Sequence, residues 1–368
     1  MLLFCLILTC LARNSITVGV WNTMRQPWLQ NSSSGILAGS ASPQWEALVN
    51  NNVVQKDIDV LHLVEIWTDT EMNKILSRKD VRSVYPYYYR PQKRNDKCGC
   101  IGPYSPYFMA LGTAFLNCLI ANGTNPREII QPSNGFLSTE CLTYGLQIVL
   151  FDRSNRTDGF LCLSCIINSA QKYIPGLFGV EQIMEQCANS TGPLYAYDGE
   201  SGHLILSKNP LIGVEEEFAY SWLSNRINVY ATYKGVRLAF GHFAYNLLED
   251  VDPRLAYMMY GYIQYQQASQ MILKHPDVII GDLNTGYNYQ PAAYNFLLQY
   301  YDSTFGHEID TYCPISHKTF PMCLGVPPQS VDHILVKKHS NIQYEEAEVF
   351  NVGPLMSDHI GIKVKLHL

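Results

Sequence analysis

The chain has 368 residues, of which 47% are hydrophobic and 16% are charged, and its formal net charge at neutral pH is -6. This length and balance predict a globular protein that buries a large core. The negative charge argues against a protein that coats nucleic acid through a broad basic face, although it is compatible with a local basic cleft.

The first twelve residues, MLLFCLILTCLA, form an apolar run that ends near the small residue Ala12. Such a run is typical of a secretory signal peptide, so we expect one over residues 1–13, with a buried first strand as the other interpretation. Four N-glycosylation sequons, which begin at Asn31, Asn122, Asn155 and Asn189, agree with export. The sequence therefore predicts a secreted or extracellular protein, or one that resides in the lumen of the secretory pathway.

Eleven cysteines are distributed unevenly, and seven of them lie between Cys98 and Cys187. In an oxidising compartment they predict disulfides, and the nine cysteines that follow the leader leave one unpaired. Cys98-x-Cys100 and Cys162-x-x-Cys165 also have the spacing of zinc half-sites. No second pair of ligands follows either motif, so disulfides are the favoured interpretation.

Apolar periodicity predicts strands and helices in alternation on both sides of the cysteine-rich segment. We expect strands over residues 15–23, 59–67, 203–207, 277–280, 331–336 and 359–366, and a hairpin over 228–243 that turns at Lys234-Gly235. We expect helices over 252–274, which opens with Asp252-Pro253, and over 292–301. This order predicts an α/β layered domain with mixed sheets, built from residues 14–97 and 191–368.

Residues 98–190 are then a disulfide-rich insertion in this domain. The insertion contains an apolar run, 108–121, that is too short to span a bilayer. A buried helix is the expected structure of this run, and a membrane-contacting surface is the alternative.

Polar side chains recur where the apolar strands end: Asn22, Glu65, His242, Asp282, Asn284, Asp332, Asp358 and His359. Carboxylate and amide oxygens suit Mg²⁺, and a histidine can accept a proton from water, which are the components of phosphodiester hydrolysis. Each component alone has a simpler interpretation. Gly281-Asp282-Leu283-Asn284 and Ser357-Asp358-His359 are turn sequences, and a histidine in an apolar strand is often a buried core residue.

The joint order of these residues resembles the endonuclease/exonuclease/phosphatase superfamily, over about residues 15–97 and 190–368. The similarity is carried by an Asn at the end of the first strand, a later Glu, a His, a Gly-Asp-x-Asn, an Asp and a terminal Ser-Asp-His. It implies a four-layer α/β sandwich, in which two mixed sheets pack face to face with helices outside.

The resemblance also implies roles for these residues. Glu65 is expected to be the main ligand of the metal, helped by Asn22, and the metal is expected to be Mg²⁺, with Mn²⁺ or Ca²⁺ as alternatives. His359 is expected to be the general base on water, with Asp332 orienting it.

His242 is expected to bind the phosphate or to assist the leaving group. Asp282 and Asn284 are expected to position the nucleophile and the scissile phosphate, and Asp358 to support the site beside the base. His333 follows Asp332 directly and is expected to lie on the opposite face of the strand, outside the site.

Two subfamilies compete for the substrate. Secreted sphingomyelinases resemble the chain in Tyr85-Pro86-Tyr87, in residues 206–211, and in the helix with Arg254 and Gln264. Pancreatic-type deoxyribonucleases share the catalytic set, but they typically have an Arg where this chain has Trp67, and a Glu that pairs with the first catalytic His. The favoured prediction is a sphingomyelin phosphodiesterase that meets a phospholipid or membrane surface.

A nuclease acting on nucleic acid is the alternative. An inactive binding or toxin module, the third hypothesis, would lack a catalytic residue, and none is missing. The sequence does not predict the oligomeric state.

Overall fold

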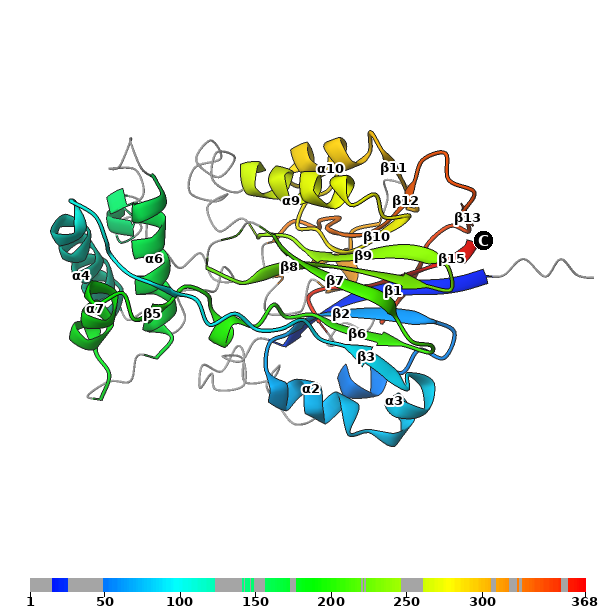
Figure 1. Ribbon diagram of the computed structural model, residues 1–368, viewed down its shortest axis with the longest axis horizontal. Coiled ribbons are helices and arrows are strands. Elements are labelled where there is room, and N and C mark those ends of the chain that lie inside the picture. The colour runs from blue at the N-terminus through cyan, green and yellow to red at the C-terminus, as the bar shows by residue number, and fades with distance from the viewer. Residues whose placement is uncertain are drawn as a thin grey trace, which may run out of the picture.

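Figure 1 presents a computed structural model of the chain. The residues that it describes are 15–25, 49–122, 141, 143–145, 147–148, 156–172, 177–219, 221, 223–245, 261–305, 309–317, 323, 326–351 and 357–368. The expected signal peptide, the sequons at Asn31 and Asn155, and Arg254 with the start of the helix over 252–274 lie outside these residues. Asn122 and Asn189, the first residues of the other two sequons, are exposed.

Two mixed sheets form the body of the protein. The first sheet contains, in spatial order, β13 (Gln343–Tyr344), β15 (Gly361–His367), β1 (Ser15–Arg25), β2 (Val60–Ile66), β6 (Leu204–Ser207) and β3 (Tyr87–Tyr89), and β14 (Glu348–Phe350) also pairs with β15. The second contains β11 (Tyr301–Ser303), β12 (Asp332–Lys337), β10 (Val278–Asp282), β9 (Val236–His242), β8 (Arg226–Tyr233) and β7 (Ile212–Ala219). β8 and β9 form the predicted hairpin.

Each sheet contains one parallel pair, β1 with β2 in the first sheet and β9 with β10 in the second, and the other pairs are antiparallel. The carboxyl ends of parallel neighbours lie at the same edge of a sheet. The antiparallel neighbours β12, β15 and β8 begin at that same edge. The polar residues at these strand ends are therefore brought to one side of the sandwich.

Helices cover the outer faces of both sheets, which gives four layers (Figure 1). α2 (Asp69–Leu76) and α3 (Lys79–Val84) cover the first sheet, and α9 (Tyr262–Leu273) and α10 (Pro291–Leu297) cover the second. Between the sheets lies an apolar core that is rich in β-branched residues, which suit the pleated faces of strands. The predicted four-layer sandwich is confirmed.

The insertion is a helical unit at one end of this body. It contains α4 (Ser105–Ala121), α6 (Arg156–Ala170) and α7 (Val180–Ala188), and β4 (Lys97–Cys98) pairs with β5 (Gly192–Pro193) where the chain leaves and re-enters the body. The apolar run over 108–121 forms a helix with one buried side, as predicted. The domain boundaries at 97 and 191 remain a prediction.

Disulfides hold these helices together. Cys100 is bonded to Cys162, Cys118 to Cys141, and Cys165 to Cys187, while Cys313–Cys323 lies in the body. The zinc alternative is therefore wrong for Cys100, Cys162 and Cys165. Cys98 is buried and unpaired, and it is the odd cysteine expected from the count.

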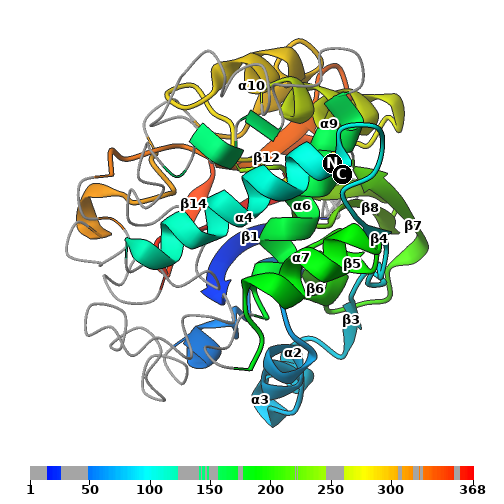
Figure 2. The ribbon, with the colours of Figure 1, turned by 90° about the vertical axis from the view of Figure 1, so that its left-hand side faces the viewer.

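The insertion stands over the edge at which the polar residues gather. In Figure 1 its helices lie beyond the end to which β1 points, and Figure 2, which looks from that side, shows α4, α6 and α7 in front of the sheets. Its apolar core includes Leu223, Ala244 and Ile263 of the body, and Ala244 is only two residues beyond His242. This packing fixes the helices beside the strand ends.

Two sequence-based expectations differ from the structure. The helix expected over 292–301 ends at Leu297, and Tyr301 instead begins β11, where its buried ring packs with the residues of α9 and α10. The edge strand β7 was not predicted, because its IGVEEEFA sequence is acidic and largely exposed. No helix among the described residues is both long enough and apolar enough to cross a membrane.

Candidate active site

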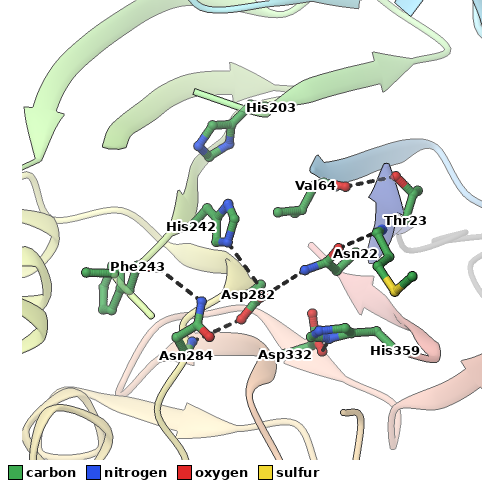
Figure 3. Close-up of polar contacts among 12 residues, drawn as sticks. Asn22, Thr23, Val64, His203, His242, Phe243, Asp282, Asn284, Asp332 and His359 are labelled. Atoms are coloured by element: carbon green, nitrogen blue, oxygen red, sulfur yellow. Dashed lines mark hydrogen bonds and ion pairs between the residues drawn. The ribbon is translucent and has the colours of Figure 1, made fainter. Parts of the chain in front are cut away.

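The strand ends of both sheets bring the eight predicted site residues to one region between the sheets. Asn22 lies near the end of β1, Glu65 near the end of β2, and His242 and Asp282 end β9 and β10. Asp282 is opposite His242 in the parallel register and opposite Asp332 in the antiparallel one. Figure 3 shows side chains from both sheets pointing into this region.

His359 and Asp332 form a buried pair. The distance from His359 Nδ1 to Asp332 Oδ2 is 2.7 Å, and because an ionised carboxylate only accepts hydrogen bonds, the imidazole is the donor. Burial lowers the pKa of His359, but the charges of Asp332 and Asp358 more than offset this effect and raise the pKa to about 10. Nδ1 is occupied, so Nε2 is the nitrogen left for chemistry.

Neighbouring residues hold this pair in place. Ser357 Oγ accepts a hydrogen bond from the His359 amide at 3.1 Å and donates to the Asn22 carbonyl at 2.8 Å. Thr311 Oγ1 accepts from the amide of Asp332 at 3.0 Å. The Ser of the terminal Ser-Asp-His thus links the base to the end of β1.

Asp282 is the centre of a second set of contacts (Figure 3). Asn22 Nδ2 donates to Asp282 Oδ2 at 2.9 Å, and the amide of Asn284 donates to Asp282 Oδ1 at 3.0 Å. Asn284 Nδ2 donates to the Phe243 carbonyl at 3.1 Å. Gly281 must lack a side chain here, because a Cβ would lie 2.0 Å from the Gly241 carbonyl oxygen.

Two site residues have a positive φ. Asn284 has φ 47°, which an Asn tolerates, whereas Glu65 has φ 66°, in the left-handed region that a Glu rarely adopts. The backbone is therefore strained at Glu65, which is the last residue but one of β2. Such strain persists where the surroundings hold it and is common at functional sites.

His242 is neutral in this site. Burial lowers its pKa well below the ordinary value, and the nearby Arg226 adds to the effect. Its Nε2 lies 3.7 Å from Asp282 Oδ2, which is longer than a hydrogen bond.

The carboxyl groups repel one another. Burial, followed by the charge of Asp332, raises the pKa of Asp282 to about 6. Burial also raises the pKa of Asp358 to about 6, with the charge of Glu65 acting in the same direction. A cation among these groups would relieve the repulsion.

Two groups of side chains could ligate such a cation. Asp282, Asp332 and His359 place ligand atoms within 4.8 Å of one another. However, His359 Nδ1 and one Asp332 oxygen already bind each other, which indicates an acid–base pair. Glu65 and Asp358 interact through their charges and offer oxygen atoms, the ligands that Mg²⁺ prefers. Asn22 offers a third oxygen, Oδ1, which accepts a hydrogen bond from the Met24 amide at 3.0 Å.

Comparisons with solved structures identify the fold. The structure of SmcL has a TM-score of 0.52 and 12% sequence identity, and the match covers 96% of this chain and 99% of SmcL. This match shows that the chain shares the fold of SmcL. Beta toxin from Staphylococcus aureus, in a mutant with bound magnesium ions, matches with a TM-score of 0.48, 14% identity, and coverage of 95% and 99%.

Sphingomyelinase C from Streptomyces griseocarneus matches with a TM-score of 0.48, 12% identity, and coverage of 96% and 99%. No family model matches the sequence, and no curated protein matches it. The likeness to SmcL establishes a shared fold, which agrees with the four-layer sandwich that the sequence resemblance implied, and leaves the activity to the site itself.

Sequence reasoning missed Arg226, which begins β8. Its side chain is buried, its Nε and Nη1 have no hydrogen-bond partner among the described residues, and it interacts with the charges of Glu65 and Asp282. Burial lowers the pKa of Arg226 to about 10, so it stays charged at neutral pH. β8 is antiparallel to β9, so β8 begins at the edge of the sheet where β9 ends. The predicted hairpin therefore already implied that a residue at the start of its first strand lies near His242.

Trp67 and His333 lie close to the site without being part of its polar centre. The Trp67 ring stacks on Tyr197 with centroids 4.3 Å apart and is 5.9 Å from the ring of His242. His333 contacts the Thr285 carbonyl at 2.7 Å and stacks on Tyr294, on the far side of β12 from Asp332. The expectation that His333 lies outside the site agrees with these contacts.

Proposed function

We propose that the chain is a secreted, Mg²⁺-dependent phosphodiesterase in which His359 activates water for attack on the phosphorus atom. The observation that carries this proposal is the buried contact between His359 and Asp332, made across the two sheets beside a set of oxygen ligands. Water loses its proton to His359 Nε2 as its oxygen attacks, and Asp332 stabilises the imidazolium that forms.

The metal site is proposed at Glu65 and Asn22, with Asp358 beside them. Magnesium, when bound, neutralises phosphate charge and polarises the phosphorus–oxygen bond. The charge of Asp332, followed by that of Asp358, raises the pKa of His359, so a cation held beside Asp358 would offset the second of these effects and lower that pKa.

The remaining residues act on the phosphate and the leaving group. Arg226 presents a buried guanidinium whose Nε and Nη1 have no hydrogen-bond partner among the described residues, which suits two phosphate oxygens. His242 is neutral, so its Nε2–H can donate to a phosphate oxygen or to the leaving oxygen. Asn284 and Asp282 position the nucleophile and the scissile phosphate.

A hollow beside the site supports sphingomyelin as the substrate. It has a volume of about 360 Å³ and lies between α6 and the start of α2. Its lining residues are Trp67, Tyr195, Tyr197, Asp69, Asp198, Glu200, Thr68, Lys93, Asn168, Gln171, Lys172 and Pro193. Three aromatic rings and the carboxylate of Asp198 suit the quaternary ammonium of a phosphocholine group. The other two carboxylates, Asp69 and Glu200, pair with Arg90, and two lysines also line the space. Exposed Ile101, Tyr104 and Tyr107 at the start of α4 suit contact with a lipid interface.

The test is hydrolysis of sphingomyelin vesicles and of plasmid DNA, side by side with Mg²⁺, by the purified protein and by His359→Ala. We expect release of phosphocholine without nicking of DNA, and neither product from the variant. Nicking without phosphocholine would select the nuclease alternative. Neither product from the wild-type protein would overturn the proposal for these substrates and favour the inactive binding module.

A further inference from the structure

His242 has one nitrogen that faces the site and one that faces a second buried histidine. Figure 3 shows His242 between Asp282 and His203. The rings of His203 and His242 are T-shaped, with centroids 6.2 Å apart. His242 Nδ1 and His203 Nε2 are both buried, and neither has a hydrogen-bond partner among the described residues.

A third histidine, His62, lies next to His203, and we call His62, His203 and His242 together the row. His62 Nε2 lies 2.8 Å from His203 Nδ1, and the two rings are stacked with centroids 5.0 Å apart and an interplanar angle of 7°. His62 comes from β2 and packs edge-on against Phe240 of β9, so the pair sits between the two sheets. Both side chains are fully buried, and an isolated pair of imidazoles in an apolar core needs an explanation.

We propose that His62 and His203 position His242 through one bridging water, in the role that a carboxylate plays beside many catalytic histidines. A ring separation of 6.2 Å is too long for a direct hydrogen bond and leaves the distance that one water spans. Two buried nitrogens without partners are the kind of groups that an internal water satisfies. His62 and His203 are positioning residues, and the role of His242 that they serve rests on the proposed function.

The row and Asp282 together select one tautomer of His242. If His62 donates to His203 Nδ1, then His203 Nε2–H donates to the water, and the water can donate to His242 Nδ1. If His203 donates to His62 instead, the water donates one proton to His203 Nε2 and can donate the other to His242 Nδ1. The choice is made at the other nitrogen, because Asp282 Oδ2 lies 3.7 Å from His242 Nε2 and a carboxylate favours an N–H that faces it. The proton of His242 is therefore on Nε2, and the water donates to Nδ1.

The electrostatics agree with neutral rings throughout. Burial lowers the pKa of His62 to about 3 and lowers the pKa values of His203 and His242 well below the ordinary value. A fixed neutral donor at Nε2 is the form that His242 needs in order to bind a phosphate oxygen or protonate a leaving oxygen.

The test reads the tautomer directly by ¹⁵N NMR of the imidazoles in the full chain, with His242 assigned by its loss in His242→Ala. The wild-type protein is expected to have a protonated Nε2 and a bare Nδ1 at His242. His203→Phe and His62→Phe remove the row, and a mixture of His242 tautomers is expected in each. His333→Phe, which removes another buried neutral histidine, is the matched control and should leave His242 unchanged.

Turnover of bis(para-nitrophenyl) phosphate gives a second readout. His203→Phe should lower kcat by about 10- to 100-fold with little change in KM, as is typical when a supporting hydrogen bond is lost. His203→Gln, which keeps an amide nitrogen at the end of the side chain, should retain more of the rate.

Protonated Nδ1 in the wild-type protein would overturn the proposal, and this result needs no variant to fold. An unchanged His242 tautomer and kcat in His203→Phe would overturn it as well. If the wild-type protein hydrolyses no phosphodiester, the proposed function fails while the NMR result still decides whether the row exists.

Discussion

His359 and Asp332 are joined by a 2.7 Å hydrogen bond that crosses from one sheet to the other. Asp332 begins β12 of the second sheet, and His359 precedes β15 of the first. The pair can therefore form only when the two sheets have packed against each other. In the proposed mechanism, activity is coupled in this way to the packing of the apolar core.

Asp332→Asn is expected to lower kcat at least a hundredfold, because the amide no longer stabilises an imidazolium at His359. The substitution also removes a charge that raises the pKa of His359, so that pKa should fall. NMR titration of His359 in metal-free protein measures the shift. Asp302→Asn, at an exposed carboxylate on β11, is the control and should change neither quantity.

Arg226→Ala is expected to lower kcat/KM by about a hundredfold, the typical effect of removing one preorganised donor to a developing oxyanion. Arg226→Lys should recover only part of the loss, because an ammonium keeps the charge but cannot form the planar two-point contact. Steady-state kinetics and inhibition by inorganic phosphate measure both effects. Arg237→Ala, at an exposed arginine that pairs with Glu215, should match the wild type.

Acid should destabilise the protein through four buried histidines: His62, His203, His242 and His333. Burial lowers the pKa of each, to about 3 for His62 and about 4 for His333. The unfolded chain binds these protons below pH 6.5, whereas the folded chain does not. Their contribution to stability is thus present above pH 6.5 and is lost as the pH falls.

Asp282 and Asp358 act in the opposite direction, because burial raises the pKa of each to about 6 and the folded chain takes up their protons first. The four histidines outnumber these two carboxyl groups, so the free energy of unfolding should fall as the pH falls below 6. Urea unfolding of metal-free protein measures the slope, and His333→Phe should reduce it by about one proton; an unchanged slope would contradict the assignment.

If residues 1–13 are removed as the sequence predicts, Cys98 should be the single thiol of the remaining chain. Burial raises its pKa to about 12, so the native protein should react slowly with a thiol reagent at neutral pH. Denaturation without reductant should release one thiol, and Cys98→Ala should release none. Nine thiols would contradict the disulfides. Reduction should loosen the insertion before the body, since three of the four bonds lie in the insertion.

Strand periodicity is a local signal, and it predicted an α/β layered domain with mixed sheets. The four-layer sandwich was implied by the family resemblance that the residues at the strand ends carry. Asn22 and Asp282 are 260 residues apart, yet each was identified from the apolar strand that it ends. The residue types of the site were predictable for the same reason. Their contacts were not, because the distance between two strand ends depends on how the sheets stack.

Arg226, His203 and His62 were missed for a different reason. Each looks like an ordinary strand residue, and its importance depends on what lies across the sheet or in the facing sheet. His62 faces His203 only because β2 and β6 pair in the observed register. The disulfide pairing in the insertion has the same origin, since cysteine spacing allows many pairings and helix packing selects one.

The most direct test of the proposed mechanism is turnover of bis(para-nitrophenyl) phosphate by wild-type protein and by His359→Ala, with Mg²⁺ and after chelation with EDTA. His367→Ala is the matched control, because His367 pairs with Glu345 at the other end of β15. The account predicts turnover by the wild type and the control with Mg²⁺, none after chelation, and a loss of at least about a hundredfold in His359→Ala with its fold intact. Turnover that survives chelation, or that stays within about tenfold in His359→Ala, would contradict it.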